Sequence, residues 1–391
     1  MNTQTKETKG SDIIIISVDP WQEERWARKQ MFAWLLAQKY RNVFYYIEPG
    51  RSERTLPLFK RLKSNLYLID VPHIPKHLQN GRISSLSVKL SCASLWLLLK
   101  LKRVKNPIFI VYQPHNMSFA KKLSSIFGKS LICYDMTDDW SEFPGISEHR
   151  KHEIISEESR VIKEADLVFA VSGRLFDKAV KLNPNSIHLP NATDFESFNK
   201  VMSNIDTSEE IRSFNRPRLG YVGNITPRRI DFELLRFIAE SKPEWNIIMI
   251  GPVHAEAADM VNSFRDLRNV FFLGPKKYYS LPEYIKGFDI CILPHRVDNL
   301  TQSMDPIKLY DYMATGKPIV ATAVAEAVKF REEICLGNSR EEFVSHIKSL
   351  LYEGATEQSL AMQLETAKKN TWDKRVEKLT EIFQEKLNEI R

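Results

Sequence analysis

Short apolar runs alternate with helical patterns along the first half of the chain. The run DIIIISV at residues 12–18 is uninterrupted, and residues 22–40 follow it with Met31, Trp34 and Leu35 at helical spacing. Continuous rather than alternating hydrophobicity is typical of strands covered on both faces, so it predicts a parallel sheet in an α/β domain. Further strands of this kind are expected at residues 42–49, 65–72, 107–114, 130–136 and 165–172.

The polar stretch at residues 199–217 interrupts this alternation, which then starts again. Two arrays of similar size predict two doubly wound, Rossmann-like domains, residues 11–200 and 215–370, that face a central cleft where ligands bind at the strands' carboxyl ends. Residues 371–391 form an amphipathic helical pattern that we expect to pack back on the first domain. In the second domain we expect strands at residues 218–224, 246–252, 269–275, 289–295 and 318–322, and helices at residues 231–241, 281–288 and 308–316.

Composition and charge exclude few classes of function. The net charge of +7 over 391 residues is compatible with nucleic acid, an anionic membrane face or phosphorylated substrates, and selects none of them. The polar start of the chain lacks the apolar core of a signal peptide. The four cysteines form no CxxC pair, which argues against a disulfide framework or a zinc site and fits a reducing cytosol.

The segment SMDPIKLYDYMATGKPIVAT, residues 303–322, predicts a short helix followed by a strand. Asp305 can cap the helix, Pro306 suits its first turn, and Gly316 suits the position just past its end. Two interpretations of Asp311 remain open. Its carboxylate either pairs with Lys308 at the surface, or accepts hydrogen bonds from the ribose hydroxyls of a nucleotide whose diphosphate lies at the helix N-terminus.

The run PIKLYDYMATGKPIVAT resembles the nucleotide-sugar segment of the family 4-like, retaining glycosyltransferases of GT-B fold. Within that group the chain is most similar to the glycosyltransferases of teichuronic acid biosynthesis in Gram-positive cell walls. The resemblance implies the GT-B arrangement, with an acceptor-binding domain first and a donor-binding domain second. It also rests on RLGYVGNITPRRIDFELL, WNIIMIGP, NVFFLGPKKYYSLPEYIKGFDICILPHR and NTWDKR, in that order, and on SVDPWQEERWARKQMFAWLLA and ICYDMTDDW in the first half.

The acidic pattern of that family is only partly present. The family has two acids eight residues apart, and the second falls on Asp311, one methylene shorter than the usual Glu. The resemblance implies that Asp311 binds the ribose. The first position, which contacts the donor sugar in the family, falls on Ser303 and lacks a carboxylate. Asp298, in the preceding loop, is an alternative source of that carboxylate.

Sugar transfer from a nucleotide donor leaves a nucleoside diphosphate, so positive charge must face the β-phosphate. No DxD motif follows a strand of the second domain, and we expect neither a metal nor a cofactor beyond the nucleotide-sugar co-substrate. Arg228 is the leading candidate for catalysis, and its alternative interpretation is a solvated loop residue. The other candidates on the donor side are Gly223, Asn224, Arg229, Lys276, Lys277 and Lys308.

On the acceptor side, Asp138 and Asp139 follow the strand at residues 130–136. Either carboxylate is suited to orient an acceptor hydroxyl or to act as its base, and an N-cap for the next helix is the alternative. The resemblance also implies that the loop after the first strand, with Arg25 and Arg28, approaches the phosphates. Asp135 and His115 complete the cleft candidates.

Residues 83–105 combine leucines at helical spacing with five basic residues: Lys89, Lys100, Lys102, Arg103 and Lys105. This pattern predicts either a basic amphipathic helix on an anionic leaflet or an ordinary helix of the acceptor domain. The lipid-linked acceptor implied by the family favours the membrane.

The sequence thus predicts a metal-independent glycosyltransferase, cytoplasmic and at the inner face of the plasma membrane. The resemblance implies that it moves a sugar from a nucleotide donor, UDP-linked, to a lipid-linked cell-wall polysaccharide precursor with retention. Nucleic acid is not an expected partner. The alternatives are a sugar-nucleotide epimerase of GT-B fold and a non-catalytic protein that binds sugar nucleotides or glycans.

Overall fold

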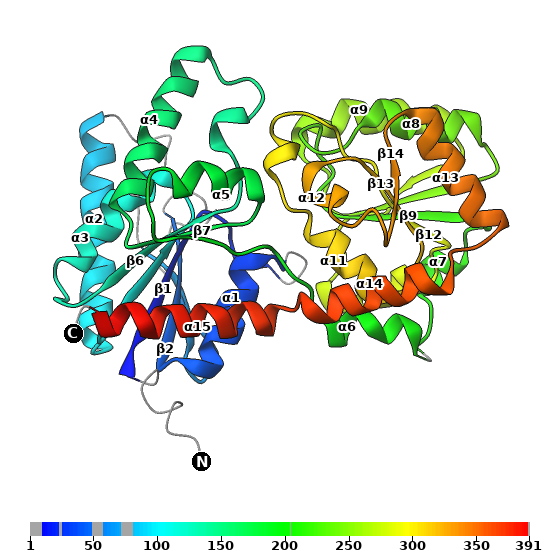
Figure 1. Cartoon of the computed structure of the whole chain (residues 1–391). Helices are drawn as coiled ribbons and strands as arrows, with labels where there is room; N and C mark the ends of the chain where they lie inside the picture. Colours follow the sequence, from blue (N-terminus) through cyan, green and yellow to red (C-terminus); the bar gives the residue numbers. More distant parts are fainter. Residues whose placement is uncertain (1–9, 23–25, 49–57, 72–80, 204, 390–391) are drawn as a thin grey trace.

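The computed structural model describes residues 10–389 except 23–25, 49–57, 72–80 and 204. Two α/β domains lie side by side, each built on its own sheet (Figure 1). The predicted fold class, two doubly wound domains with parallel sheets, is confirmed. We call them the N-terminal and the C-terminal domain.

The sheet of the N-terminal domain has the strand order β3-β4-β2-β1-β5-β6-β7-β8. All neighbouring strands are parallel except β3 and β4, which pair antiparallel at the edge. The bounds are β1 (Asp12–Ser17), β2 (Asn42–Ile47), β3 (Leu58–Lys63), β4 (Leu66–Asp70), β5 (Ile108–Val111), β6 (Leu131–Met136), β7 (Leu167–Ala170) and β8 (Ser186–His188). The sequence did not predict β3 and β8.

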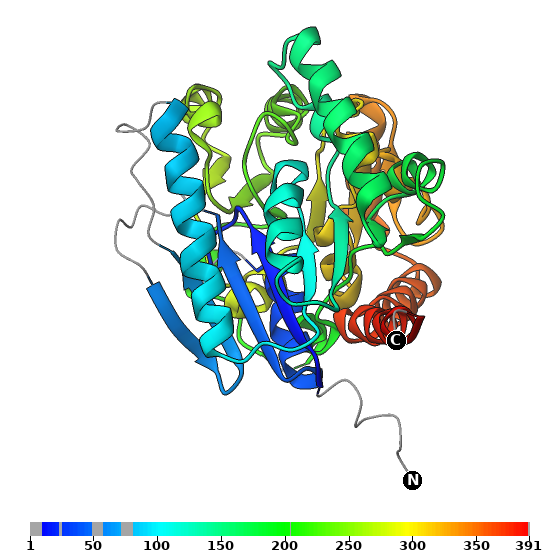
Figure 2. The same cartoon turned by 90° about the vertical axis from the view of Figure 1, so that its left-hand side faces the viewer.

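Helices cover both faces of this sheet, as the uninterrupted apolar strands require. The helix predicted from residue 22 begins at Arg28. Figure 2 shows that α2 lies on the outer side of the domain, away from α15. The helices are α1 (Arg28–Lys39), α2 (Gly81–Leu101), α3 (Met117–Ser124), α4 (Glu148–Glu164) and α5 (Gly173–Val180).

The sheet of the C-terminal domain is parallel throughout, in the order β11-β10-β9-β12-β13-β14. Its strands are β9 (Arg218–Val222), β10 (Asn246–Ile250), β11 (Val270–Phe272), β12 (Ile290–Leu293), β13 (Ile319–Thr322) and β14 (Cys335–Gly337). Its helices are α8 (Phe232–Ser241), α9 (Ala258–Asn262), α10 (Leu281–Lys286), α11 (Ile307–Thr315), α12 (Ala325–Val328) and α13 (Arg340–Tyr352).

The chain passes between the domains twice. The short helix α6 (Phe195–Asn199) ends where the polar stretch at residues 199–217 begins. A second short helix, α7 (Glu209–Arg212), lies within that stretch. After α14 (Glu357–Lys369) the chain returns, and α15 (Trp372–Glu389) lies along the N-terminal domain (Figure 1). Trp372 packs edge-on against Phe32 of α1, with ring centroids 5.8 Å apart. Within the residues that the structure covers, no helix combines the length and hydrophobicity that a membrane span requires.

Candidate functional site

A cavity of about 690 Å³ lies between the two domains and is lined by residues of both. Its wall follows the carboxyl ends of β1, β5 and β6 on one side and of β9, β10 and β12 on the other. This is where doubly wound sheets bind ligands. Trp26 stacks on Tyr278 across the domain boundary, with centroids 6.1 Å apart, and both rings border the cavity.

Two glycines bring bare backbone to the cavity wall. A Cβ on Gly251 would lie 1.9 Å from the carbonyl oxygen of Gly223, and a Cβ on Gly223 would lie 2.6 Å from Tyr221 Oη. Neither position therefore accepts a side chain without rearrangement. Gly223 and the neighbouring Asn224 line the cavity where the sequence places them.

Four of the predicted cations, Arg228, Arg229, Lys276 and Lys308, lie on the donor side of the wall. Arg228 donates to Glu256 at 2.8 Å, and Arg229 approaches Asp138 of the other domain at 3.9 Å. Lys308 lies in the first turn of α11, where backbone N–H groups have no partner within the helix. These groups together give the wall positive charge beside the glycine backbone.

The structure corrects the prediction that both lysines after β11 lie on the donor side of the cavity. Lys276, rather than Lys277, lines the cavity, and it forms an ion pair with Glu210 at 2.7 Å. Lys277 occupies the N-cap of a short 3-10 turn, residues Tyr278–Ser280. Its side chain is therefore not placed among the donor-side cations.

Asp311 does not reach the cavity wall. Its carboxylate is fully buried and accepts hydrogen bonds from Thr193 Oγ1 at 2.8 Å and from Lys308 Nζ at 3.0 Å. Burial raises the pKa of Asp311, and Lys308 counteracts this shift. Of the two interpretations of Asp311, the structure supports the ion pair with Lys308. The Asp311 carboxylate of this pair is buried rather than at the surface, where the sequence placed it. Asp311 adjoins the site through Lys308.

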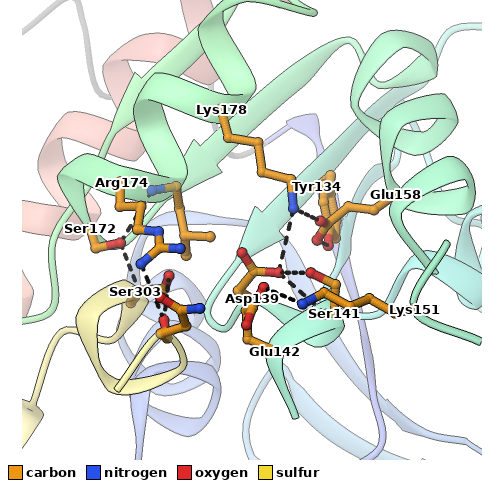
Figure 3. A network of polar contacts seen from close by, with 12 residues as sticks. Tyr134, Asp139, Ser141, Glu142, Lys151, Glu158, Ser172, Arg174, Lys178 and Ser303 are labelled. Carbon is orange, nitrogen blue, oxygen red and sulfur yellow. Dashed lines mark hydrogen bonds and ion pairs between the residues drawn. The ribbon is translucent and has the colours of Figure 1, made fainter. Parts of the chain in front are cut away.

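The prediction that Ser303 contacts the donor sugar is also corrected. Ser303 is buried in the contact between the domains. Its carbonyl oxygen accepts a hydrogen bond from Ser172 Oγ at 2.7 Å, and its hydroxyl donates to the backbone of Asn299 (Figure 3). Asp298 accepts from the backbone of Thr301 and is likewise absent from the wall. Neither residue supplies a carboxylate to the cavity.

The two aspartates after β6 differ in position. Asp138 lines the cavity, whereas Asp139 does not. Asp139 accepts hydrogen bonds from the backbone and hydroxyl of Ser141 (Figure 3). Lys178 lies 3.5 Å from Asp139 and 2.5 Å from Glu158. Asp139 is thus the N-cap that the sequence allowed as the alternative. Burial raises the pKa of Asp138, and the nearby Arg229 and Lys29 counteract this shift.

Further acceptor-side candidates are already paired. Arg28 borders the cavity, but its guanidinium forms two hydrogen bonds, 2.8 and 2.9 Å long, with the fully buried carboxylate of Asp135. His115 forms an ion pair with Glu48 at 3.0 Å and does not line the cavity. These expectations are corrected accordingly. Arg25 lies outside the described residues.

Asp305 is not the predicted helix cap, because Pro306 occupies the N-cap position of α11. The carboxylate of Asp305 instead accepts from the backbone N–H of Asn191 at 2.6 Å and from the hydroxyl of Tyr310 at 3.0 Å. Burial raises the pKa of Asp305 to about 7. This carboxyl group belongs to the cavity wall and joins the two domains.

The polar wall residues that sequence reasoning missed include Asp19, Lys29, Gln113 and His295. Asp19 and Gln113 each lie two residues past the end of a strand, as Asp138 does, and that spacing is the signal that could have found them. Burial lowers the pKa of His295 to about 3, so its imidazole is neutral. Within the described residues, His, Cys, Asp and Glu nowhere gather in groups of three or more that could hold a metal ion.

The chain is similar to known proteins both in sequence and in fold. A Bacillus subtilis (strain 168) protein named as a teichuronic acid biosynthesis glycosyltransferase, TuaH, is 27% identical over 264 residues. The match covers 64% of this chain and 66% of that protein, so the chain spans about two thirds of the relative's length.

Two solved structures share the fold over nearly the whole chain. Sucrose-phosphate synthase from Thermosynechococcus elongatus superposes with a TM-score of 0.73 at 14% identity, over 96% of this chain and 98% of that one. HepE from Anabaena, in complex with UDP-glucose, gives 0.70 at 15% identity, over 96% and 99%. Residues 216–353 match the family of glycosyl transferases group 1. The chain therefore has the GT-B fold, and its C-terminal half carries a glycosyltransferase domain of group 1.

Proposed function

We propose that the protein transfers a sugar from a UDP-linked donor to a lipid-linked precursor of a cell-wall polysaccharide, with retention of configuration. The observation that carries the proposal is the cavity between the domains, with Arg228, Arg229 and Lys308 on its donor side. A group 1 glycosyltransferase domain forms that side. The relative named for teichuronic acid biosynthesis supports a cell-wall product.

The donor-side wall is suited to a diphosphate. The backbone at Gly223 and Gly251 permits close approach, and the N-terminus of α11, at Ile307 and Lys308, borders the cavity, where its dipole favours an anion. When the bond to the sugar breaks, negative charge grows on the β-phosphate, and preorganised cations stabilise it. Arg228, Arg229 and Lys308 supply that charge, so we propose that transfer needs no metal. HepE, which shares the fold, was solved with UDP-glucose, and this supports UDP as the leaving group.

Of the two aspartates after β6, Asp138 lines the acceptor side of the cavity and Asp139 does not. We assign to Asp138 the orientation of the acceptor hydroxyl and the acceptance of its proton. The raised pKa of Asp138 increases its affinity for that proton. A proton acceptor must lie within hydrogen-bond reach of the hydroxyl, and the cavity gives an acceptor access to this carboxylate.

The proposed lipid-linked acceptor places the protein at an anionic membrane face, and α2 offers a suitable surface. Leu95 and Leu99 are buried in the domain, whereas Leu90, Leu97 and Leu101 are exposed. These three leucines share one side of the helix because seven and four residues separate them. The basic residues around this face are Lys89, Lys100, Arg103 and Lys105, all exposed.

The activity is tested by incubating the protein with a panel of UDP-, GDP- and ADP-sugars, with and without EDTA, and following the products by mass spectrometry. We expect slow release of UDP from one UDP-sugar, unaffected by EDTA. Conversion of the donor to its C2 epimer would instead show an epimerase. Measurable UDP binding with an unchanged donor, even when membrane lipid extracts are added, would show a non-catalytic binding protein.

A further inference from the structure

Three polar residues form a row along the acceptor side of the cavity: Asp19, Gln113 and Asp138. We call them the strand-end row, because each lies two residues past the end of β1, β5 or β6. These three strands are direct neighbours in the sheet. All three residues line the cavity. Parallel packing thus brings together Asp19 and Gln113, which are 94 residues apart along the chain, and Asp138, which lies 25 residues after Gln113.

Gln113 at the centre of the row has polar atoms without a partner. Its side chain is 3% exposed, and neither its Oε1 nor its Nε2 forms a hydrogen bond within the part of the chain that the structure describes. A buried amide without partners is costly, and most buried polar groups in native proteins have a hydrogen-bond partner. Because Gln113 borders the cavity, a bound ligand can supply the missing partners. An amide both donates and accepts, which matches a sugar hydroxyl.

The charges beside the row are already committed to each other. Lys29 forms an ion pair with Asp19 at 2.5 Å, and Asp138 faces Arg229 of the donor side. Arg28 is held by Asp135. The side chains of Arg28 and Lys29 are only 3% and 10% exposed in these pairs. Arg228 and Arg229 on the donor side are also paired, but they are 42% and 38% exposed and so remain open to a ligand. Among the described residues of the acceptor side of the wall, no exposed cation is therefore left for a phosphate or a carboxylate. The Gln113 amide, which has no partner, is suited to neutral hydroxyls.

Aromatic rings complete this side. Trp140 and Phe143 line the cavity and stack on each other with centroids 5.1 Å apart. Aromatic faces pack against the C–H face of a sugar ring while polar side chains bind its hydroxyls. Both kinds of group are present here within one wall.

We propose that the strand-end row binds the hydroxyls of an uncharged sugar ring, which is the acceptor end of the glycan. This rests on the proposed function, because the row is an acceptor site only if the donor side binds a nucleotide sugar. Gln113 bridges two hydroxyls, Asp19 fixes Lys29 and accepts from the ring, and Asp138 faces the hydroxyl that is glycosylated. The subsite thereby selects a neutral acceptor over a uronic acid or a sugar phosphate.

The test measures UDP release from the preferred UDP-sugar in the presence of octyl glycosides. The probes are octyl glucoside, galactoside, N-acetylglucosaminide and N-acetylgalactosaminide, against octyl glucuronide. We expect at least one neutral glycoside to accelerate UDP release about tenfold more than the glucuronide. A stronger effect of the glucuronide, or no acceleration by any probe while UDP still binds, would overturn the inference. Failure of the wild-type protein to bind UDP would instead remove the proposed function, and this inference with it.

Two variants test the row itself. Gln113→Leu should raise the KM for the neutral glycoside about tenfold, whereas Gln358→Leu, an exposed glutamine on α14, should leave it unchanged. UDP binding, measured calorimetrically, reports whether the Gln113→Leu protein is folded. Asp19→Asn frees Lys29 and should shift the preference towards the glucuronide by about tenfold. A KM for Gln113→Leu within twofold of wild type, or an unchanged preference in Asp19→Asn, contradicts the assignment.

Discussion

Asp138 of the N-terminal domain and Arg229 of the C-terminal domain face each other across the cavity, with 3.9 Å between carboxylate Oδ1 and guanidinium Nη2. Arg229 counteracts the effect of burial on the pKa of Asp138. A diphosphate that binds Arg229 would neutralise part of that positive charge. The pKa of Asp138 would then rise further, and Asp138 would become a stronger proton acceptor once the donor is bound.

We expect Arg229→Gln to weaken UDP binding by about tenfold to a hundredfold, because a charge-assisted hydrogen bond contributes about 1.5–3 kcal/mol. Isothermal titration calorimetry with UDP measures this directly. Arg268→Gln is the matched control, since Arg268 is exposed and not on the cavity wall. Equal affinities of the two variants would show that Arg229 does not contact the diphosphate.

Asp311→Asn tests whether the buried carboxylate serves the donor site. Asn keeps the shape of the side chain but removes the charge that holds Lys308 at 3.0 Å. We expect UDP affinity to fall about tenfold and the free energy of unfolding to fall by about 1–3 kcal/mol. Thr193→Val, the control, removes only the hydrogen bond from the Thr193 hydroxyl to Asp311 and keeps the ion pair with Lys308, so it should lower stability without changing UDP affinity. Loss of stability with unchanged affinity in Asp311→Asn would make Asp311 purely structural.

The stability of the protein should depend on the ionisation of Asp305. Its pKa is raised to about 7 in the folded state from 3.8, so the folded state holds a proton that the unfolded state has released. Stability is then lost as pH rises from about 4 to 7, by up to about 4 kcal/mol at about 1.4 kcal/mol per pKa unit. Above pH 7 this contribution is constant.

Denaturant titrations at pH 5, 6, 7 and 8 measure this effect. Asp305→Asn cannot ionise, so its free energy of unfolding relative to wild type should increase from pH 5 to 7 and then level off. The exposed Asp206→Asn serves as the control and should parallel wild type. A constant difference between Asp305→Asn and wild type at all four pH values would contradict the predicted shift.

Gly251→Ala should damage the donor wall. The added methyl would lie 1.9 Å from the carbonyl oxygen of Gly223, so the backbone at the cavity must move. We expect the free energy of unfolding to fall by about 1–3 kcal/mol and UDP binding to weaken strongly. Gly10→Ala is the control, because its methyl meets no atom within 4 Å. If Gly251→Ala bound UDP as tightly as Gly10→Ala, close approach of the backbone would not be required.

The main strands could be predicted because strands covered on both faces are uninterrupted apolar runs. The edge strand β3 was missed, since its sequence LFKRLK mixes three apolar with three basic residues and shows neither an uninterrupted apolar run nor strict alternation. The three-residue strand β8, Ser186–His188, is too short for a periodic signal. Both lie at opposite edges of the sheet, where burial on two faces is not required.

The site could be predicted where its residues follow directly from a strand end or a helix start, as Gly223, Arg229 and Lys308 do. It could not be predicted where a distant partner decides the outcome. Arg28 is 107 residues away from Asp135 in sequence, and the contact of Ser303 with Ser172 forms only when the two domains dock. Such pairings depend on the tertiary structure, which local spacing does not encode.

The exposed face of α2 leads to a prediction about membranes. Leu97 and Leu101 are 53% and 73% exposed, and exposed basic residues border them. An apolar strip beside cations binds anionic bilayers by inserting side chains among the headgroups and by electrostatic attraction. We expect the protein to pellet with vesicles that contain 30% phosphatidylglycerol at low salt, and to be released at high salt, where charge screening weakens the attraction.

Two variants separate this face from the net charge of the protein. Leu97→Glu combined with Leu101→Glu should abolish pelleting, because it places two carboxylates on the inserting strip. The control exchanges Met202 and Tyr352, which are similarly exposed on other elements, for Glu, and so makes the same change in charge elsewhere. If both double variants lost binding equally, the attraction would be due to net charge alone. If both still pelleted, α2 would not be the membrane-binding surface.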